Sequence, residues 1–398
     1  MIRRNLTLFL ITLCACLGFS FAAIKLSNEA SNANPVYVEV PNEIDGVAPK
    51  LSSSGAIQVA LLLDTSGSMN GLIEQAKSQL WNILNTLSRI QKGNQEAELQ
   101  IALYEYGNPS TTNSEFQIHQ LSEFTTDMDL ISEKLFSLST NGGDEYCGAV
   151  IKKSLEDLEW NDNESMKMIY IAGNEAFTQG PIHYSEACAQ AKSKGIVVNT
   201  IFCGNQSDGI RALWNNGAFA GGGDYINIAH NEATVYISTP YDDKIEKLNS
   251  QLNDTYIPYG DKGSEKQRNQ RRQDTNASMY SRSNVADRIS FKSSKKYKSE
   301  DWDLIDAYNK DKSILKSADI KSDKYKSMTI EDLEANIEAV SIERESVQKQ
   351  IRALDNQRRE YKASEAKKNK GGIKNSLQQS ILKTIEMQAK KKGFVIKE

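Results

Sequence analysis

The chain has 398 residues with a formal net charge of −4, 39% hydrophobic residues, 25% charged residues and 5 Cys. This apolar fraction can build a core, and five cysteines cannot hold so long a chain together, which excludes collagen-like, fully disordered and disulfide-framework proteins. At roughly 100–200 residues per domain there is room for two or three domains. The three scattered histidines, His119, His183 and His230, provide no local spacing for a His-rich zinc site or a Ser-His-Asp triad.

Residues 1–23 have the pattern of a secretory signal peptide. Arg3 and Arg4 precede an apolar run, and Ser20-Phe21-Ala22 offers the small residues that a signal peptidase reads. The run reaches only the short end of the ~17–25 residues that span a membrane, which disfavours a transmembrane anchor. A lipoprotein acylated at Cys16 is a further alternative. We therefore expect an exported protein, periplasmic or extracellular.

The composition changes along the rest of the chain. Residues 24–54 are expected to form an extended leader, because their three prolines discourage helix. Residues 45–240 contain 23 acidic and 11 basic residues, whereas residues 241–398 contain 26 acidic and 34 basic residues. This contrast predicts two different structural regions.

The first region alternates strand-like and helix-like segments. Residues 57–63 are a nearly continuous apolar run that ends at Asp64, as expected for a buried parallel strand, and apolar residues then recur at helical spacing over 72–87. Further strands are predicted at 99–106, 116–124, 166–172, 196–202 and 225–228. Further helices are predicted at 128–138, 147–159, 183–193, 208–219 and 242–254. This order predicts an α/β fold with a doubly wound, mainly parallel six-stranded sheet and helices on both faces.

The loop after the first strand is rich in oxygen-bearing side chains. Asp64, Ser66 and Ser68 stand at alternate positions, so their oxygens can turn toward one point. Ligands of such sheets bind outside the carboxyl ends of the strands, where this loop lies. Carboxylate and hydroxyl oxygens suit Mg²⁺, Mn²⁺ or Ca²⁺. The alternative is a metal-free loop in which Ser66 or Ser68 caps the following helix.

This loop resembles the metal-ion-dependent adhesion site (MIDAS) of von Willebrand factor type A (vWA) domains, whose first motif is Asp-x-Ser-x-Ser after a buried strand. Residues 139–145, Ser-Thr-Asn-Gly-Gly-Asp-Glu, are similar to the family's second loop, which implies Asp144 as a metal ligand and Thr140 as the second choice. Leu213 to Ile228 is similar to the Leu…Ala…Gly-Gly-x-Tyr stretch before the family's last strand. The resemblance covers residues 55–256 and implies a divalent cation, with Mg²⁺ as first choice and Mn²⁺ or Ca²⁺ as alternatives.

One motif departs from the family. After the fourth strand the family has Asp-Gly, where this chain has Gly173-Asn174-Glu175. The family's carboxylate is therefore missing, or its place is taken by Asn174 or Glu175. An anionic Asp144 would offset the lost charge, because two carboxylates facing a divalent ion supply what desolvation of the metal demands.

Three cysteines remain after removal of the signal peptide: Cys147, Cys188 and Cys203. In an oxidising compartment we expect one disulfide among them, close to the carboxyl edge of the sheet, with all three pairings open. The alternatives are buried free thiols or a thiolate metal site.

The second region is rich in Lys, Glu, Gln and Ser and is expected to be helical. Residues 257–328 are predicted to form a charged, partly helical linker. Residues 329–398 carry apolar residues at 3–4 spacing, interrupted at Gly371-Gly372, which predicts an antiparallel helical hairpin or a coiled coil. Arg344 and Arg358 break the apolar seam and disfavour a parallel homodimer with a long dry interface.

These features favour binding over catalysis. The resemblance implies a binding or scaffold module whose metal leaves one position open for an acidic residue of a protein partner. No general base and no nucleophile motif is evident, which disfavours a metal-assisted hydrolase or an accessory subunit of an envelope enzyme complex, so we do not expect an enzyme. Nucleic-acid binding is a poor explanation for the positive charge of residues 241–398, here called the basic half, because aromatic residues are not interleaved with the Lys and Arg clusters. Peripheral contact with an anionic envelope surface is the other use considered for it.

Overall fold

A computed structural model of the chain describes residues 55–93, 95–109, 115–162, 164–228, 236–368 and 377–397. All of them belong to one unit, Ser52–Glu398. The predicted signal peptide with Cys16, the predicted leader, His230 and the glycine pair at 371–372 lie outside the described residues. Within the described residues, no helix combines the length and the apolar character needed to cross a membrane.

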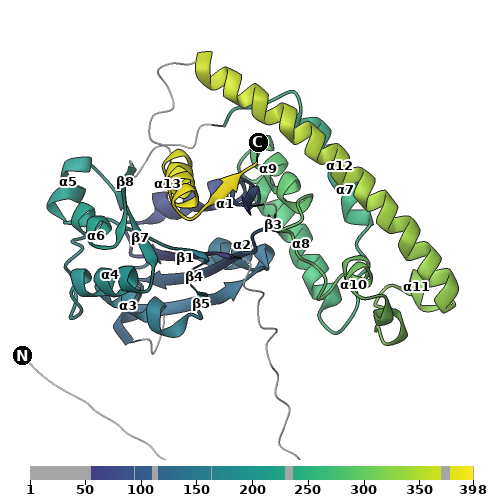
Figure 1. The fold of residues 1–398 in the computed structure, drawn as a ribbon, viewed down its shortest axis with the longest axis horizontal. Helices are drawn as coiled ribbons and strands as arrows, with labels where there is room; N and C mark the ends of the chain where they lie inside the picture. Colours follow the sequence, from purple (N-terminus) through teal and green to yellow (C-terminus); the bar gives the residue numbers. More distant parts are fainter. Residues whose placement is uncertain are drawn as a thin grey trace, which may run out of the picture. The chain divides into compact units, whose positions relative to one another are not determined.

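A six-stranded sheet forms the centre of the first region (Figure 1). Its strand order is β5-β4-β1-β6-β7-β8, and neighbouring strands are parallel except β4 and β5. The strands are β1 Ile57–Asp64, β4 Leu99–Tyr106, β5 Ile118–Thr125, β6 Met166–Gly173, β7 Ile196–Cys203 and β8 Gly222–Ile228. The predicted doubly wound, mainly parallel sheet is confirmed.

Helices cover both faces of this sheet. In β1, Val59 and Leu63 enter the core shared with α1 and α2, whereas Ala60 and Leu62 enter the core shared with α3, α4 and α6. Because side chains alternate along a strand, a strand buried on both faces has a continuous apolar sequence. The helices are α1 Asn70–Leu87, η1 Glu115–Gln117, α2 Met128–Ser137, α3 Cys147–Asp157, α4 Tyr184–Ser193, α5 Gln206–Arg211 and α6 Trp214–Ala220.

The single helix predicted over 208–219 is two short helices, α5 and α6. Leu213 lies between them with φ of 66°, in the left-handed region through which a right-handed helix cannot continue. This turn seats Trp214 in the core, with its ring centroid 4.7 Å from that of Phe177.

The second region is a set of packed helices rather than the linker predicted over 257–328. α9 packs on α1 of the sheet region, where the ring centroids of Phe291 and Trp81 are 5.8 Å apart. Composition suggested a solvated segment, but many of its charges pair with one another and can therefore be buried. The helices are α7 Asp242–Asp254, α8 Gly263–Ser278, α9 Arg282–Lys292, α10 Leu304–Lys310, η2 Lys312–Lys316, α11 Asp323–Lys326 and α12 Ile330–Lys368.

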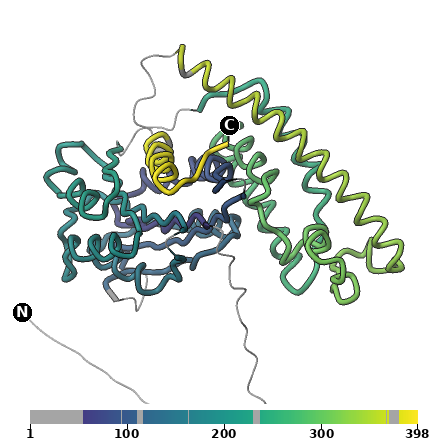
Figure 2. The backbone as a smooth tube through the Cα atoms, in the orientation of Figure 1, coloured from purple at the N-terminus to yellow at the C-terminus, as the bar shows by residue number. Residues whose placement is uncertain are grey.

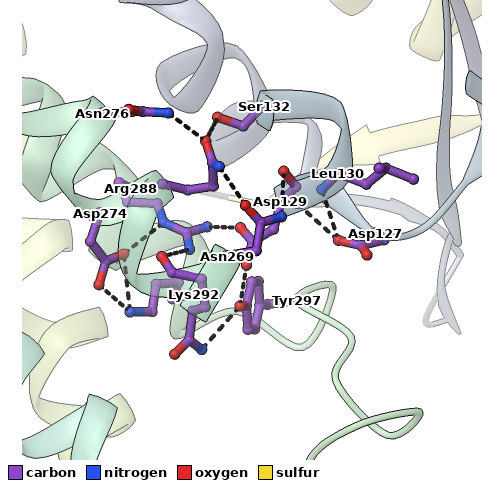
Figure 3. A network of polar contacts seen from close by, with 12 residues as sticks. Asp127, Asp129, Leu130, Ser132, Asn269, Asp274, Asn276, Arg288, Lys292 and Tyr297 are labelled. Carbon is purple, nitrogen blue, oxygen red and sulfur yellow. Dashed lines mark hydrogen bonds and ion pairs between the residues drawn. The ribbon is translucent and has the colours of Figure 1, made fainter. Parts of the chain in front are cut away.

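A buried ion-pair network joins the two regions (Figure 3). Arg288 of α9 is fully buried, with Nη1 2.6 Å from Asp129 Oδ1 of α2, and its Nε donates to Asp274 Oδ1 of α8 at 2.9 Å. Lys292 Nζ donates to Asp274 Oδ2 at 2.8 Å, and Tyr297 Oη donates to Asp129 Oδ2 at 2.6 Å. Burial raises the pKa of Asp274, but Lys292 and Arg288 outweigh burial and hold that pKa below its usual value.

The two arginines that interrupt the apolar seam of α12 are also buried in ion pairs. Arg344 Nη1 donates to Asp303 Oδ2 at 2.5 Å, and Arg358 Nη1 donates to Asp287 Oδ1 at 2.6 Å. α12 contacts α7, α9 and α10 of its own chain. The arginine positions therefore mark where α12 docks on neighbouring helices.

The last described segment folds back onto the sheet region (Figures 1 and 2). Ile381, Ile385 and Phe394 belong to the same core cluster as the side chains of α1. The segment packs chiefly on α1 and β8, so it does not form the predicted hairpin with α12. Its strand β9 pairs antiparallel with β2, which pairs with β3. The elements are α13 Leu377–Lys391, β9 Phe394–Ile396, β2 Ile90–Lys92 and β3 Gln95–Glu96.

Candidate metal centre

Several loops meet at the carboxyl edge of the sheet. The loop after β1 is joined to the end of β4, where Thr65 N donates to Tyr106 O at 2.9 Å. The segment 139–145 joins the first loop, where Asn141 N donates to Thr65 O at 3.0 Å. The carboxyl ends of parallel strands share one edge, so residues far apart in the sequence gather there.

The first loop presents oxygen atoms from Asp64, Ser66 and Ser68. The Asp64 side chain is fully buried; its Oδ1 accepts a hydrogen bond from Ser66 N at 2.7 Å, and its Oδ2 has no hydrogen-bond partner among the described residues. Ser66 Oγ and Ser68 Oγ are 3.3 Å apart. α1 begins after Met69 and has no side-chain cap there, so the structure does not support the alternative in which the loop only caps the helix.

The electrostatics of the loop suit a cation. The pKa of Asp64 is raised to about 7. Burial is the largest cause, the hydrogen bonds from Ser66 act against it, and the charges of Glu145 and Glu175 add to the rise. A buried carboxylate oxygen with no partner and with acidic neighbours is costly without a positive charge. Together with two hydroxyls it forms a donor set that fits a hard divalent cation.

The second loop lies where the resemblance implies, but its side chains are placed differently from the prediction. Thr140 Oγ1 donates to Asn70 Oδ1 at 2.6 Å, beside the first turn of α1. Asp144 is exposed, and its Oδ2 accepts a hydrogen bond from Tyr146 Oη at 3.1 Å. The next residue, Glu145, is buried beside the first loop: an ideal Cβ on Gly107 would lie 3.1 Å from Glu145 Cγ and 3.6 Å from Ser66 Cβ. Sequence reasoning passed over Glu145, because two adjacent acids gave no signal of which one faces the site.

The packing around Gly173, where the loop after β6 begins, explains the departure from the family motif. An ideal Cβ on Gly173 would lie 2.7 Å from Tyr106 Oη and 3.1 Å from Asp64 Oδ2, so a side chain there would require Tyr106 to move. Asn174 Nδ2 donates to Ser68 Oγ at 2.9 Å. The Glu175 side chain is exposed, while its carbonyl oxygen accepts a hydrogen bond from a buried indole.

The predicted disulfide is absent: Cys147, Cys188 and Cys203 are free, buried thiols. Cys203 lies in the core on one face of the sheet and the other two in the core on the opposite face, so the sheet separates Cys203 from both. Burial raises the pKa of each thiol above its usual value. No group of three His, Cys, Asp or Glu side chains arranged to hold a metal occurs among the described residues, so a thiolate site is not seen there.

The structure thus defines a doubly wound α/β domain with an oxygen-rich candidate site at the carboxyl edge of its sheet. Residues 58–213 match the family model of the von Willebrand factor type A domain. The chain contains a vWA domain, which is typically a module for protein interaction and in some proteins has a MIDAS. No curated protein matches the chain.

Several solved structures are similar to part of this chain. The hypothetical protein BatB from Bacteroides thetaiotaomicron is 15% identical with a TM-score of 0.34, over 44% of this chain and 91% of that chain. The vWA domain of the pilus tip protein Mfa5 from Porphyromonas gingivalis is 13% identical with a TM-score of 0.32, over 45% and 91%. Proximal thread matrix protein 1 from the mussel byssus, with zinc in its MIDAS motif, is 12% identical with a TM-score of 0.34, over 45% and 43%.

Proposed function

We propose that this chain is an exported, metal-dependent protein-binding module. Asp64, Ser66 and Ser68 hold a divalent cation, with Mg²⁺ as first choice because it prefers hard oxygen ligands. When bound, the cation offers an open coordination position to an Asp or Glu carboxylate of a partner protein. The observation that carries the proposal is the buried Asp64 Oδ2, which has no hydrogen-bond partner among the described residues.

The surrounding residues prepare this site for a ligand. Ser66 N engages Asp64 Oδ1 and so fixes the carboxyl group with its second oxygen free. Asn174 holds the Ser68 hydroxyl from the neighbouring loop. Gly67 and Ser68 are exposed, so a partner can approach the loop from solvent.

Metal binding is tested by calorimetric titration of Mg²⁺, Mn²⁺ and Ca²⁺ into the chain without residues 1–23. The comparison is a double variant, Asp64→Ala with Ser66→Ala, and the matched control is Asp162→Asn, an exposed acid that precedes β6 near the opposite edge of the sheet. We expect saturable binding in the parent and the control and none in the double variant. Equal binding by all three proteins, or no binding by the parent, contradicts the proposal.

The partner is sought with the metal-loaded parent as bait and the double variant as the negative control. A partner that binds only the metal-loaded parent, and that loses binding when one of its own Asp or Glu residues is replaced, supports the proposal. Binding that survives removal of the metal by a chelator contradicts it.

Export is part of the proposal and is supported by the signal-peptide pattern of residues 1–23. Mass spectrometry of the mature N terminus tests it. A periplasmic or extracellular chain that has lost Arg3 and Arg4 supports export, and an acylated chain that begins at Cys16 identifies the lipoprotein alternative. A mature chain that retains both arginines contradicts cleavage. Contact of the basic half with an envelope surface stays a prediction.

A further inference from the structure

We propose that Glu145 supplies the second carboxylate of the metal site, in place of the acid that the family motif has at the position of Gly173. This inference rests on the proposed function, since it assigns a further ligand to the same cation. Glu145 approaches the site from the segment before α3, whereas Gly173 ends β6.

The geometry around Gly107 brings Glu145 to the first loop. An ideal Cβ on Gly107 would lie 3.0 Å from Asp64 Oδ1, 3.1 Å from Glu145 Cγ and 3.6 Å from Ser66 Cβ. These three side chains therefore surround one point beside the end of β4. The Ser66 side chain, itself one of the candidate ligands, also favours the charged form of Glu145, although burial outweighs it and raises the pKa of that carboxyl group.

Glu145 is held in this position by contacts on its backbone. Its N–H donates to Gln179 Oε1 at 3.2 Å, and its carbonyl oxygen accepts a hydrogen bond from Cys147 N at 3.2 Å, where α3 begins. The residue is 8% exposed, although glutamate is almost never buried unless it is paired. The charges that act on it most are those of Glu175 and Asp144, which are both negative.

The unpartnered Asp64 Oδ2 is the independent observation that points to a ligand. Asp64 is fully buried, and Glu145 is a nearly buried acid beside it. Two carboxylates close together away from water repel each other, and a divalent cation between them reverses that repulsion. A shared cation therefore accounts for both the buried orphan oxygen and the burial of the second acid.

The other polar residues near the site are placed less well for this role. Gly173 has no room for a side chain while Tyr106 occupies its present position. Asp144 and Glu175 are exposed, and the Asp144 carboxylate already accepts a hydrogen bond from Tyr146. Asn174 is neutral and bonds to Ser68. Glu105 is buried too, but its carboxylate accepts a hydrogen bond from Thr65 Oγ1, which is not a candidate ligand, and lies 3.2 Å from His119 Nδ1. Glu145 is thus the acid that combines charge and burial with a place beside both Asp64 and Ser66.

The test compares Glu145→Gln with two matched controls, Asp144→Asn and Glu175→Gln, which remove the same charge from exposed neighbours. Calorimetry gives the dissociation constants for Mg²⁺, Mn²⁺ and Ca²⁺, and the metal-induced rise in melting temperature is an independent readout. We expect Glu145→Gln to weaken binding on the order of 10–100-fold, as loss of a metal ligand or its direct support does, and each control to change it less than about threefold. Without metal, Glu145→Gln should melt at or above the parent temperature, because a buried charge is removed.

The outcomes separate this inference from the proposed function. If Asp64→Asn abolishes binding while Glu145→Gln binds like the parent, Glu145 is not a ligand and the proposed function stands. If Glu175→Gln or Asp144→Asn weakens binding as much as Glu145→Gln, the acids act only through their charge and the assignment of Glu145 is overturned. If the parent binds none of the three ions, both proposals fail together.

Discussion

Replacing Asp64 by Asn tests whether the candidate centre carries a stability cost that a cation relieves. Burial raises the pKa of Asp64 from 3.8 to about 7, so between pH 4 and pH 7 the native state binds a proton that the unfolded state does not. The free energy of unfolding of the metal-free protein should therefore fall as pH rises through this window. At 1.36 kcal/mol per pKa unit, the loss reaches about 4 kcal/mol above pH 7.

Asn keeps the oxygen that accepts from Ser66 N and cannot ionise. Like the protonated acid, the Asn side chain has a buried polar donor without a partner. The variant and the parent should therefore have similar free energies of unfolding near pH 4. In the presence of a metal chelator, the variant should become more stable than the parent as pH rises, and the difference in free energy of unfolding should reach at most about 4 kcal/mol at pH 8. Urea unfolding at several pH values measures this gain, and the exposed control Asp162→Asn should stay within about 0.5 kcal/mol of the parent throughout.

Metal should act in the opposite direction. At a hundred times its dissociation constant, a ligand that binds only the native state stabilises it by about 2.7 kcal/mol. At pH 8, Mg²⁺ should therefore reduce the stability difference between Asp64→Asn and the parent, because it stabilises the parent and leaves the variant unchanged. A stability difference that does not vary with pH, or an Asn variant less stable than the parent at pH 8, would refute the reasoning.

Three further predictions concern packing and redox state. Ile385→Ala should lower the free energy of unfolding in urea by about 2–5 kcal/mol, because Ile385 is buried in the core. Lys390→Ala, on an exposed part of α13, should lower it by less than about 0.5 kcal/mol. Equal effects would mean that α13 is not part of the core. Arg288→Met should cost about 3–5 kcal/mol, because Asp129 would keep a buried charge without its ion-pair partner and Asp274 would keep only Lys292. A cost below about 1 kcal/mol would show that the network contributes little. The three cysteines of the described residues should react with a thiol reagent only after unfolding, as peptide mapping can show, and a reductant that lowers the melting temperature would reveal a disulfide instead.

The sheet and the first loop could be predicted because local sequence carries their physics. β1 is buried on both faces, so its apolar run is unbroken, and the oxygen-bearing residues follow directly where it ends. The contacts across the site are different, because they depend on which loops meet. Nothing in the spacing of Asp144 and Glu145 shows that the first is exposed and the second buried beside Ser66.

The cysteine prediction failed for a related reason. Cys147 begins a helix, Cys188 lies within one and Cys203 ends a strand, so all three were expected near one edge of the sheet. The position along an element does not determine the face of the sheet that a side chain enters. Cys203 points to one core and the other two to the opposite core, so the sheet excludes both pairings of Cys203. Cys147 and Cys188 share a core and are nevertheless free thiols.

The prediction of a charged linker in the basic half was wrong, because composition gives the number of charges but not which of them pair. Arg344 and Arg358 interrupt the apolar seam of α12, yet each occupies a buried site with carboxylates from other segments of the chain. An isolated buried charge is costly, whereas a paired one is tolerated when its hydrogen bonds are satisfied, as those of Arg358 are by Asp287, Asp242 and Ser283. Whether an arginine lies in solvent or in such a site depends on partners more than forty residues away in the sequence.

The course of the chain after β8 links the candidate centre to the helical region. α7 leads from the sheet into the helices, and α13 returns to pack on α1 and β8, so the helical region is inserted between two parts of one core. α1 begins directly after the loop that carries Asp64, Ser66 and Ser68, and it contacts both α13 and α9. Because α1 packs against both the returning segment and the inserted helices, its position depends on both. The position of the loop that carries Asp64, Ser66 and Ser68 therefore depends on both as well.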